Sequence, residues 1–255
     1  MNTLPDMHHL VTVIIFIVLS LSAYADQAQT INIATYIEPP SSDFIDGQYV
    51  GETNEVAKLL SKQLKITPHF IQCPIARCLE MVKTGQADMI VAIRKTGDRE
   101  KYLSYLTPPF KIQYFPLRFY IRKETQGDIK QFEDLNTLAI GVVRGASYFD
   151  KFDRDNTLNK IAVTTHTQLV QMLLKKRIDT FLEREETIIP LVDRGTYQAK
   201  IKLATYQYDN AVGSYIAISK KSLFHKDIER LSSALQTLIM SGEIMKILNQ
   251  YNTPQ

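Results

Sequence analysis

The feature that most limits the folds open to this chain is a repeated alternation of strand and helix patterns. Short apolar runs typical of buried strands are separated by segments whose apolar residues recur at helical spacing. The first half predicts strands at 31–36, 68–73 and 87–93, with helices at 53–64 and 75–85 between them. Such alternation favours mostly parallel sheets that are covered by helices on both faces.

The same order returns in the second half of the chain. There Thr165 is placed to cap a helix, and two amphipathic helices separated by Gly242 end the chain. Two successive units of this kind predict an α/β fold with two sheets and a ligand cleft between them, where strand ends and loops converge. The pattern predicts further strands at 114–122, 138–143, 160–165, 179–183, 200–206 and 213–219.

Composition and charge exclude several classes of protein. Of the 255 residues, 45% are hydrophobic and 22% are charged, which is ordinary for a globular protein. The net charge is only +3, and no block of five or more Lys and Arg residues occurs. A nucleic-acid partner is therefore not expected.

The first 25 residues have the pattern of a secretory signal peptide. An apolar stretch from Leu10 to Leu21 ends in small residues, and Ala23 and Ala25 form a cleavage signal before Asp26. The stretch is shorter than the roughly 20 apolar residues that span a bilayer, although an uncleaved anchor is the alternative. The segment before it carries histidines in place of Lys or Arg. We expect residues 1–25 to be removed and the mature protein to be periplasmic.

The only two cysteines, Cys73 and Cys78, lie close together in the sequence CPIARC. In an oxidising compartment such a pair is expected to form a disulfide. Residues five apart on a regular helix are too distant to bridge, so the chain should turn near Pro74 before its helix starts. A metal site is the alternative, but no His or further Cys lies nearby in the sequence.

Several motifs stand in the order found in one protein family. Gly51 precedes EVAKLLSKQL, VKTGQADMIVA matches the pattern LxxGxxDxIxA, and TGDREKYLSYLTPPF is similar to TxERxxxxxFSxPY. FEDLNTLAIGVVRGAS, LLKKRIDTFLE and the terminal SALQTLIMSGEIMKILNQY continue the series. From about Ile31 to Tyr251 the chain resembles, as a divergent member, the periplasmic amino-acid-type solute-binding proteins (extracellular solute-binding protein family 3).

This resemblance implies the two-lobed, type II periplasmic-binding-protein fold, in which each lobe is a sheet flanked by helices and two crossover strands join the lobes. Lobe 1 would comprise residues 26–113 and 209–255, and lobe 2 residues 114–208. It also implies a monomer that captures a small carboxylate-bearing or amino-acid-like ligand by lobe closure. The implied partner is an ABC permease for import, or a membrane receptor for signalling, and neither catalysis nor a cofactor is implied.

The resemblance places Arg99 where family members pair an arginine with the ligand carboxylate. A guanidinium fork matches a carboxylate and stays charged at any working pH. Arg94 replaces a small hydroxyl residue of the amino-acid binders, and Arg184 replaces the acid that holds the ligand ammonium. Glu183 or Glu185 would serve that acid's role only if the strand register shifts by one, so ordinary amino-acid binding is in doubt.

Further candidates line the expected cleft. The RGAS loop, with Arg144 and Ser147, is a candidate anion-binding loop, and Arg77 sits where divergent members carry a cleft arginine. Convergence of these arginines would predict a ligand with more than one negative charge. For each of them the alternative is a solvated surface arginine. Tyr36 and Phe110 are candidate aromatic walls, with core packing as the alternative.

An enzymatic alternative comes from the same fold. Some proteins that resemble this family are dehydratases of the cyclohexadienyl (prephenate or arogenate) type, in which a cleft carboxylic acid protonates the leaving hydroxyl group. Glu183 or Glu185 beside several arginines would suit that chemistry. His69, His166 and His225 are far apart in sequence and lack metal-ligand spacing, so no metal site is expected.

Overall fold

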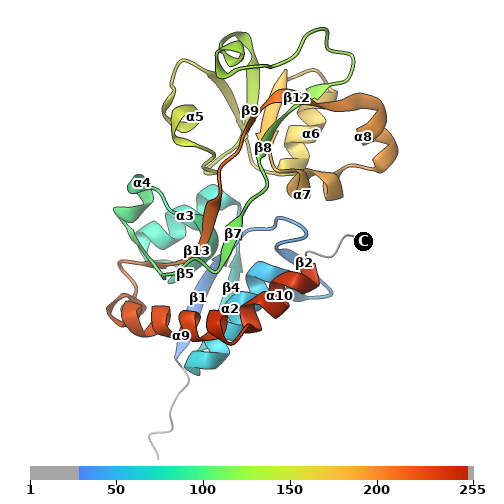
Figure 1. The fold of residues 1–255 in the computed structure, drawn as a ribbon. Helices are drawn as coiled ribbons and strands as arrows, with labels where there is room; N and C mark the ends of the chain where they lie inside the picture. The colour runs from blue at the N-terminus through green and yellow to red at the C-terminus, as the bar shows by residue number, and fades with distance from the viewer. Residues whose placement is uncertain (1–28, 252–255) are drawn as a thin grey trace, which may run out of the picture.

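The computed structural model describes residues 29–251, which form two lobes joined by two connections (Figure 1). The predicted signal peptide therefore lies outside the described residues. The sheet of the first lobe has the order β4-β1-β5-β13-β6, and β7 pairs with β13. A small β2–β3 hairpin lies beside it. The strands are β1 (Thr30–Thr35), β2 (Asp43–Ile45), β3 (Gln48–Val50), β4 (Thr67–Gln72), β5 (Met89–Arg94), β6 (Leu103–Tyr105), β7 (Lys111–Gln113) and β13 (Val212–Ser219).

Helices cover both faces of this first sheet because its strands alternate apolar side chains between two cores. Ile33 packs in one core, beneath α2, α9 and α10, while the next residue, Ala34, packs in the other, beneath α3. The helices of this lobe are α2 (Glu52–Leu64), α3 (Ile75–Thr84), α4 (Gly97–Glu100), α9 (Ile228–Met240) and α10 (Glu243–Tyr251), with a 3-10 turn at Leu223–Asp227.

The second lobe contains a five-stranded sheet in the order β10-β9-β11-β8-β12. β9 pairs in parallel with β10 and β11, whereas β8 runs antiparallel to β11 and β12. Its elements are β8 (Leu117–Arg122), β9 (Ala139–Val143), α5 (Asp150–Arg154), β10 (Asn159–Val163), α6 (His166–Leu174), β11 (Thr180–Glu183), α7 (Glu185–Ile188), α8 (Arg194–Lys200) and β12 (Ile201–Tyr208), with 3-10 turns at Phe132–Thr137 and Ile189–Leu191.

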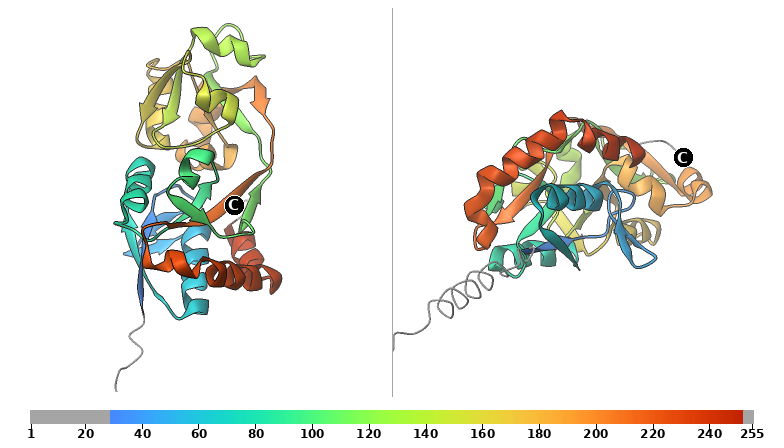
Figure 2. Two further views of the ribbon diagram at one scale, coloured as in Figure 1. Left: turned by 90° about the vertical axis from the view of Figure 1, so that its left-hand side faces the viewer. Right: turned by 90° about the horizontal axis from the view of Figure 1, so that it is seen from below.

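The two connections between the lobes run along the same side of the molecule (Figure 2). One links β7 to β8 and the other links β12 to β13. The expected changes of lobe at 113/114 and 208/209 fall within these connections.

Several local predictions are confirmed. Thr165 caps α6 by accepting a hydrogen bond from the backbone N–H of Gln168. The helix predicted at 75–85 is α3, and Gly85 ends it in the left-handed conformation, with φ 84°. The predicted strand at 114–122 is wrong at its start, since β8 begins only at Leu117. Pro116 has no N–H for a ladder, and Phe115 is exposed in the connection.

Candidate functional site

A cavity of about 360 Å³ lies between the two lobes. Its wall is formed by the ends of β1, β5 and β11, by the segment from Cys73 to Ile75, and by the start of α6. Carboxyl ends of strands and the loops after them are the usual places for ligand sites in α/β folds. The volume falls within the range of pockets for small molecules.

Arg99 is the buried cation of the first lobe, with only 6% of its surface exposed. The backbone N–H of Arg99 bonds to the hydroxyl of Thr96, which fixes the turn that carries it. Its Nη1 donates to the carbonyl of Arg94 at 2.8 Å, and its Nη2 donates to the carbonyl of Gly145 at 2.8 Å. Because Gly145 belongs to the second lobe, Arg99 joins the two lobes beside the cavity.

The lobes also touch at the backbone of Gly145. This glycine has φ +87°, and a Cβ atom there would lie 2.9 Å from the Cα atom of Ala76. A side chain at this position would therefore collide with the first lobe.

The second lobe contributes a buried ion pair. Nε2 of His166 lies 3.1 Å from Oε1 of Glu183, and both residues line the cavity. Burial alone would lower the pKa of His166, but its hydrogen bond with Glu183 and the charges of Glu38 and Glu183 raise it to about 9. Burial also opposes the charge on Glu183, yet the contacts of His166 hold the pKa of Glu183 below its usual value. The pair is therefore imidazolium with carboxylate at neutral pH.

Glu38 brings a second carboxyl group to this pair from the first lobe. Its Oε1 lies 3.9 Å from Nε2 of His166 and accepts a hydrogen bond of 3.4 Å from the hydroxyl of Thr187. Burial raises the pKa of Glu38, and His166 only partly opposes this effect. Glu38 and His166 therefore form a second polar contact across the cleft.

Two more arginines line the cavity. Arg94 is one of them, and its guanidinium has no hydrogen-bond or ion-pair partner among residues 29–251. Its backbone carbonyl accepts hydrogen bonds from Arg99 and Tyr105. The Nε atom of Arg184 donates to the carbonyl of Phe115 at 3.3 Å, which leaves its terminal nitrogens unused by the described chain.

The structure brings together six of the residues proposed from sequence, namely Tyr36, Arg94, Arg99, Ser147, Glu183 and Arg184. Tyr36 donates its hydroxyl to the carbonyl of Ala92, and Ser147 donates its own to Asp153.

The other three proposed residues do not line this cavity. Phe110 is buried in the core of the first lobe, which agrees with the alternative interpretation that it packs in the core. Arg77 is exposed and contacts Gln86. Arg144 is exposed and lines a separate groove, because its neighbour Val143 occupies the inward position at the end of β9. Glu185, the second candidate acid, also lies outside the cavity wall.

The sequence interpretation missed Glu38 and His166 as site residues. A signal was present, because each lies within two residues of the carboxyl end of a predicted strand, where ligand sites gather. His166 also occupies the first position after the helix cap Thr165.

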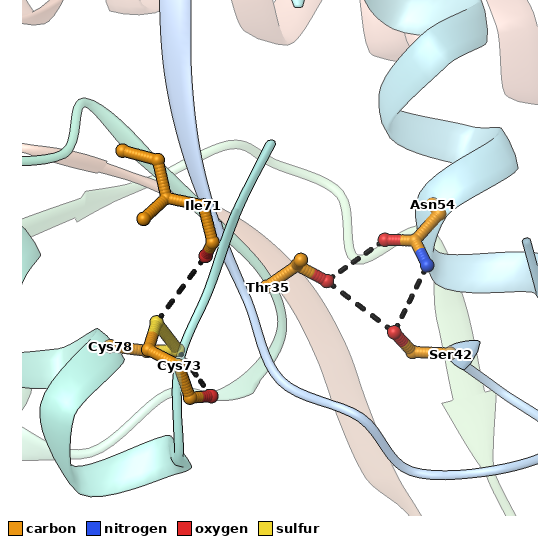
Figure 3. The surroundings of a disulfide bond; sticks show 6 residues. All are labelled: Thr35, Ser42, Asn54, Ile71, Cys73 and Cys78. Carbon is orange, nitrogen blue, oxygen red and sulfur yellow. Dashed lines mark hydrogen bonds between the residues drawn. A yellow bond between two sulfur atoms is a disulfide. The ribbon is translucent and has the colours of Figure 1, made fainter. Parts of the chain in front are cut away.

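The predicted disulfide is confirmed, with the Cα atoms of Cys73 and Cys78 5.4 Å apart. Cys73 precedes the helix, which starts at Ile75 after the turn at Pro74, and this turn forms part of the cavity wall. Figure 3 shows the bond beside a hydrogen-bonded group of Thr35, Ser42 and Asn54. That group ties the end of β1 to the start of α2.

Within residues 29–251, no group of three or more His, Cys, Asp or Glu side chains is placed to hold a metal ion. In the same part of the chain, no helix has both the length and the apolar character needed to cross a membrane.

Solved structures share this fold. An ancestral arginine-binding protein bound to arginine superposes with a TM-score of 0.73 at 19% identity, over 88% of this chain and 98% of that one. An arginine-specific periplasmic binding protein of Salmonella typhimurium gives 0.73 at 16% identity, over 89% and 100%. A histidine kinase sensor domain similar to periplasmic binding proteins also gives 0.73 at 16%, over 89% and 97%.

Sequence comparison identifies the family. Among curated proteins, none is detectably similar to this chain in sequence. The family described as bacterial extracellular solute-binding proteins, family 3, matches residues 31–254. This match extends over both lobes and includes every residue of the cavity wall named above. The chain therefore belongs to the bacterial extracellular solute-binding proteins of family 3.

Proposed function

We propose that this protein captures a small carboxylate-bearing solute in the periplasm by closing its two lobes around it. The observation that carries the proposal is the position of Arg99, whose buried guanidinium lies in the cavity wall and reaches Gly145 of the opposite lobe. A carboxylate seated there would bind to a preformed cation and would add its own contacts to those that already hold the lobes together.

In this proposal the two lobes close by bending at the two connections that join them. Residues 26–113 and 209–255 would move as one lobe and residues 114–208 as the other, bending at the two connections. Because ligand contacts come from both lobes, a bound ligand shifts the equilibrium toward the closed form by its differential affinity for that form.

The closed lobes would present the ligand-bound state to a membrane partner. Proteins with this fold include the substrate-binding protein of an amino acid ABC transporter and a histidine kinase sensor domain. Import through an ABC permease and signalling through a receptor therefore both fit a monomer that is released into the periplasm after cleavage near Ala25. Loss of solute uptake on deletion, restored by the wild-type gene, would identify import.

The first test is a thermal-shift screen of the purified protein against amino acids, dicarboxylates and sugar acids. A ligand at a hundred times its Kd should stabilise the fold by about 2.7 kcal/mol. For a chain of this size that corresponds to a shift of roughly 5–10 °C. No shift with any carboxylate would refute the proposed ligand class.

A second candidate function, dehydration of a cyclohexadienyl acid, is favoured by one observation. Glu38 is a half-buried carboxyl group with a raised pKa in an arginine-lined cavity, which suits a general acid. Glu183 is less suited to that role because its pKa is lowered by His166. Glu38 would give its proton to the leaving hydroxyl group while the substrate carboxylate departs as carbon dioxide and the ring becomes aromatic. Incubation with prephenate, followed by absorbance of phenylpyruvate, tests this directly.

A further inference from the structure

Each oxygen of Glu183 already has one hydrogen-bond partner within the protein. Oε1 contacts Nε2 of His166 at 3.1 Å, and Oε2 accepts the backbone N–H of Arg184 at 2.9 Å. Only 8% of the side-chain surface of Glu183 is exposed. A ligand ammonium that reached it would share these oxygens with donors that are already in place.

The imidazolium of His166 lies beside the carboxylate to which the ammonium group of an amino acid ligand would bind. The imidazole is buried against Glu183 and also faces Glu38 of the first lobe. A ligand ammonium drawn to either carboxylate would meet the charged ring at short range, and two like charges in a poorly solvated site repel strongly. The histidine thus acts as an internal counter-ion for the acids of the cleft.

The remaining charges of the cavity wall are positive. The wall contains three arginines and His166, against the two acids Glu38 and Glu183. With His166 charged, four positive groups therefore face two acids, one of which, Glu38, has a pKa raised by burial. The side chains of Arg94 and Arg184 keep guanidinium nitrogens that bind nothing else in residues 29–251. Such an excess favours a ligand that carries at least two negative charges.

We infer that the cleft selects dicarboxylates that lack an amino group, because the side chain of His166 supplies to Glu183 the positive charge that an amino acid ligand would otherwise bring. This inference rests on the proposed function and narrows its ligand class. One carboxylate binds beside Arg99, and the second binds near Arg94 and Arg184. The same charges exclude arginine, to which one of the compared proteins is bound and for which another is specific. They exclude other cationic amino acids as well.

The experiment compares acids that differ only in the amino group. Calorimetry at pH 7 measures Kd for glutarate against L-glutamate and for succinate against L-aspartate, with L-arginine as a further probe. The wild-type protein should bind glutarate or succinate at least about tenfold more tightly than the matched amino acid. It should not bind arginine.

The variant His166→Gln keeps a hydrogen-bond donor but removes the charge. Glu183 is then without its counter-ion, so the ratio of the two Kd values should move toward the amino acid by at least about tenfold. Adding Glu183→Gln to this variant should abolish that gain. His225→Gln is the matched control, because His225 contacts Ser104 away from the cavity and its loss should leave the ratio unchanged.

The outcomes separate the inferred selection against amino acids from the proposed binding of carboxylates. Tighter binding of glutamate or aspartate than of the matched acid by the wild-type protein would overturn the inference and leave the proposed carboxylate binding intact. An unchanged ratio in His166→Gln would also overturn it. Absence of binding by every acid would refute both. The wild-type comparison stands alone if the variants do not fold.

Discussion

Nε2 of His166 lies 3.1 Å from Oε1 of Glu183, and the pair is enclosed between a helix start and a strand end of the second lobe. The partners are 17 residues apart in the chain, so the fold and not the local sequence creates the contact. This ion pair should affect two measurable properties of the protein. One is its choice between dicarboxylates and amino acids, and the other is the dependence of its stability on pH.

Stability should depend on pH through His166. Its pKa in the folded protein is about 9, above the ordinary value of 6.5. The folded state therefore prefers the protonated ring, and this contribution is fully present below pH 6.5 and is lost as pH rises through about 9. Urea unfolding at pH 6 and pH 9.5 should differ by up to about 3 kcal/mol. In His166→Gln this part of the difference should disappear, whereas His225→Gln should keep it.

Removal of the Arg99 guanidinium should abolish most ligand binding without unfolding the protein. Arg99→Ala loses a charged donor to the ligand and the bond to Gly145, so we expect Kd to rise by roughly 10- to 150-fold. Arg99→Lys keeps the charge but not the fork and should recover only part of the affinity. Arg194→Ala, on the exposed helix α8, serves as the control in the same titration. Unchanged affinity in Arg99→Ala would contradict the assignment.

Ala92 should tolerate glycine but not a branched residue. It lies near the end of β5 with φ +60°, a conformation that L-residues other than Asn and Asp rarely adopt. Ala92→Val should lower the free energy of unfolding by about 2 kcal/mol, whereas Ala92→Gly should change it by less than about 1 kcal/mol. Urea denaturation of the two variants beside the wild type measures the difference. Equal losses in both would show that packing at this position matters more than backbone conformation.

Loss of the disulfide should cost modest stability. The loop closed by Cys73 and Cys78 is short, with a sequence separation of 5, so the chain-entropy model gives about 2 kcal/mol. Replacing both residues by serine, or unfolding under a reducing agent, should lower the urea midpoint by a corresponding amount. The reducing agent should have no effect on the double variant, which separates loss of the bond from other effects of the reductant.

Features set by local chemistry could be predicted from the sequence. Thr165 and Gly85 mark helix ends because a hydroxyl caps an N-terminus and a glycine accepts the left-handed conformation. The turn before α3 follows in the same way, since a regular helix would hold Cys73 and Cys78 too far apart.

The detailed site could not be predicted, because it depends on the direction of side chains in loops. Arg144 follows the inward-facing Val143 and so points outward, while Arg99 is drawn inward by two carbonyls, one of which is 46 residues away in sequence. The contact of Glu38 with His166 likewise joins segments of different lobes. No local pattern contains such information.

The close approach of Gly145 to Ala76 is a steric contact between the two lobes, which limits how far they can close at this point. At this contact between the lobes the chain carries only a hydrogen atom, so a larger residue here would keep this part of the two lobes further apart. A methyl group at Gly145, as in Gly145→Ala, would push the lobes apart without removing any charged group from the cavity wall. Affinity would then fall through geometry alone, and the reach of Arg99 across the cleft would be the first contact to be lost.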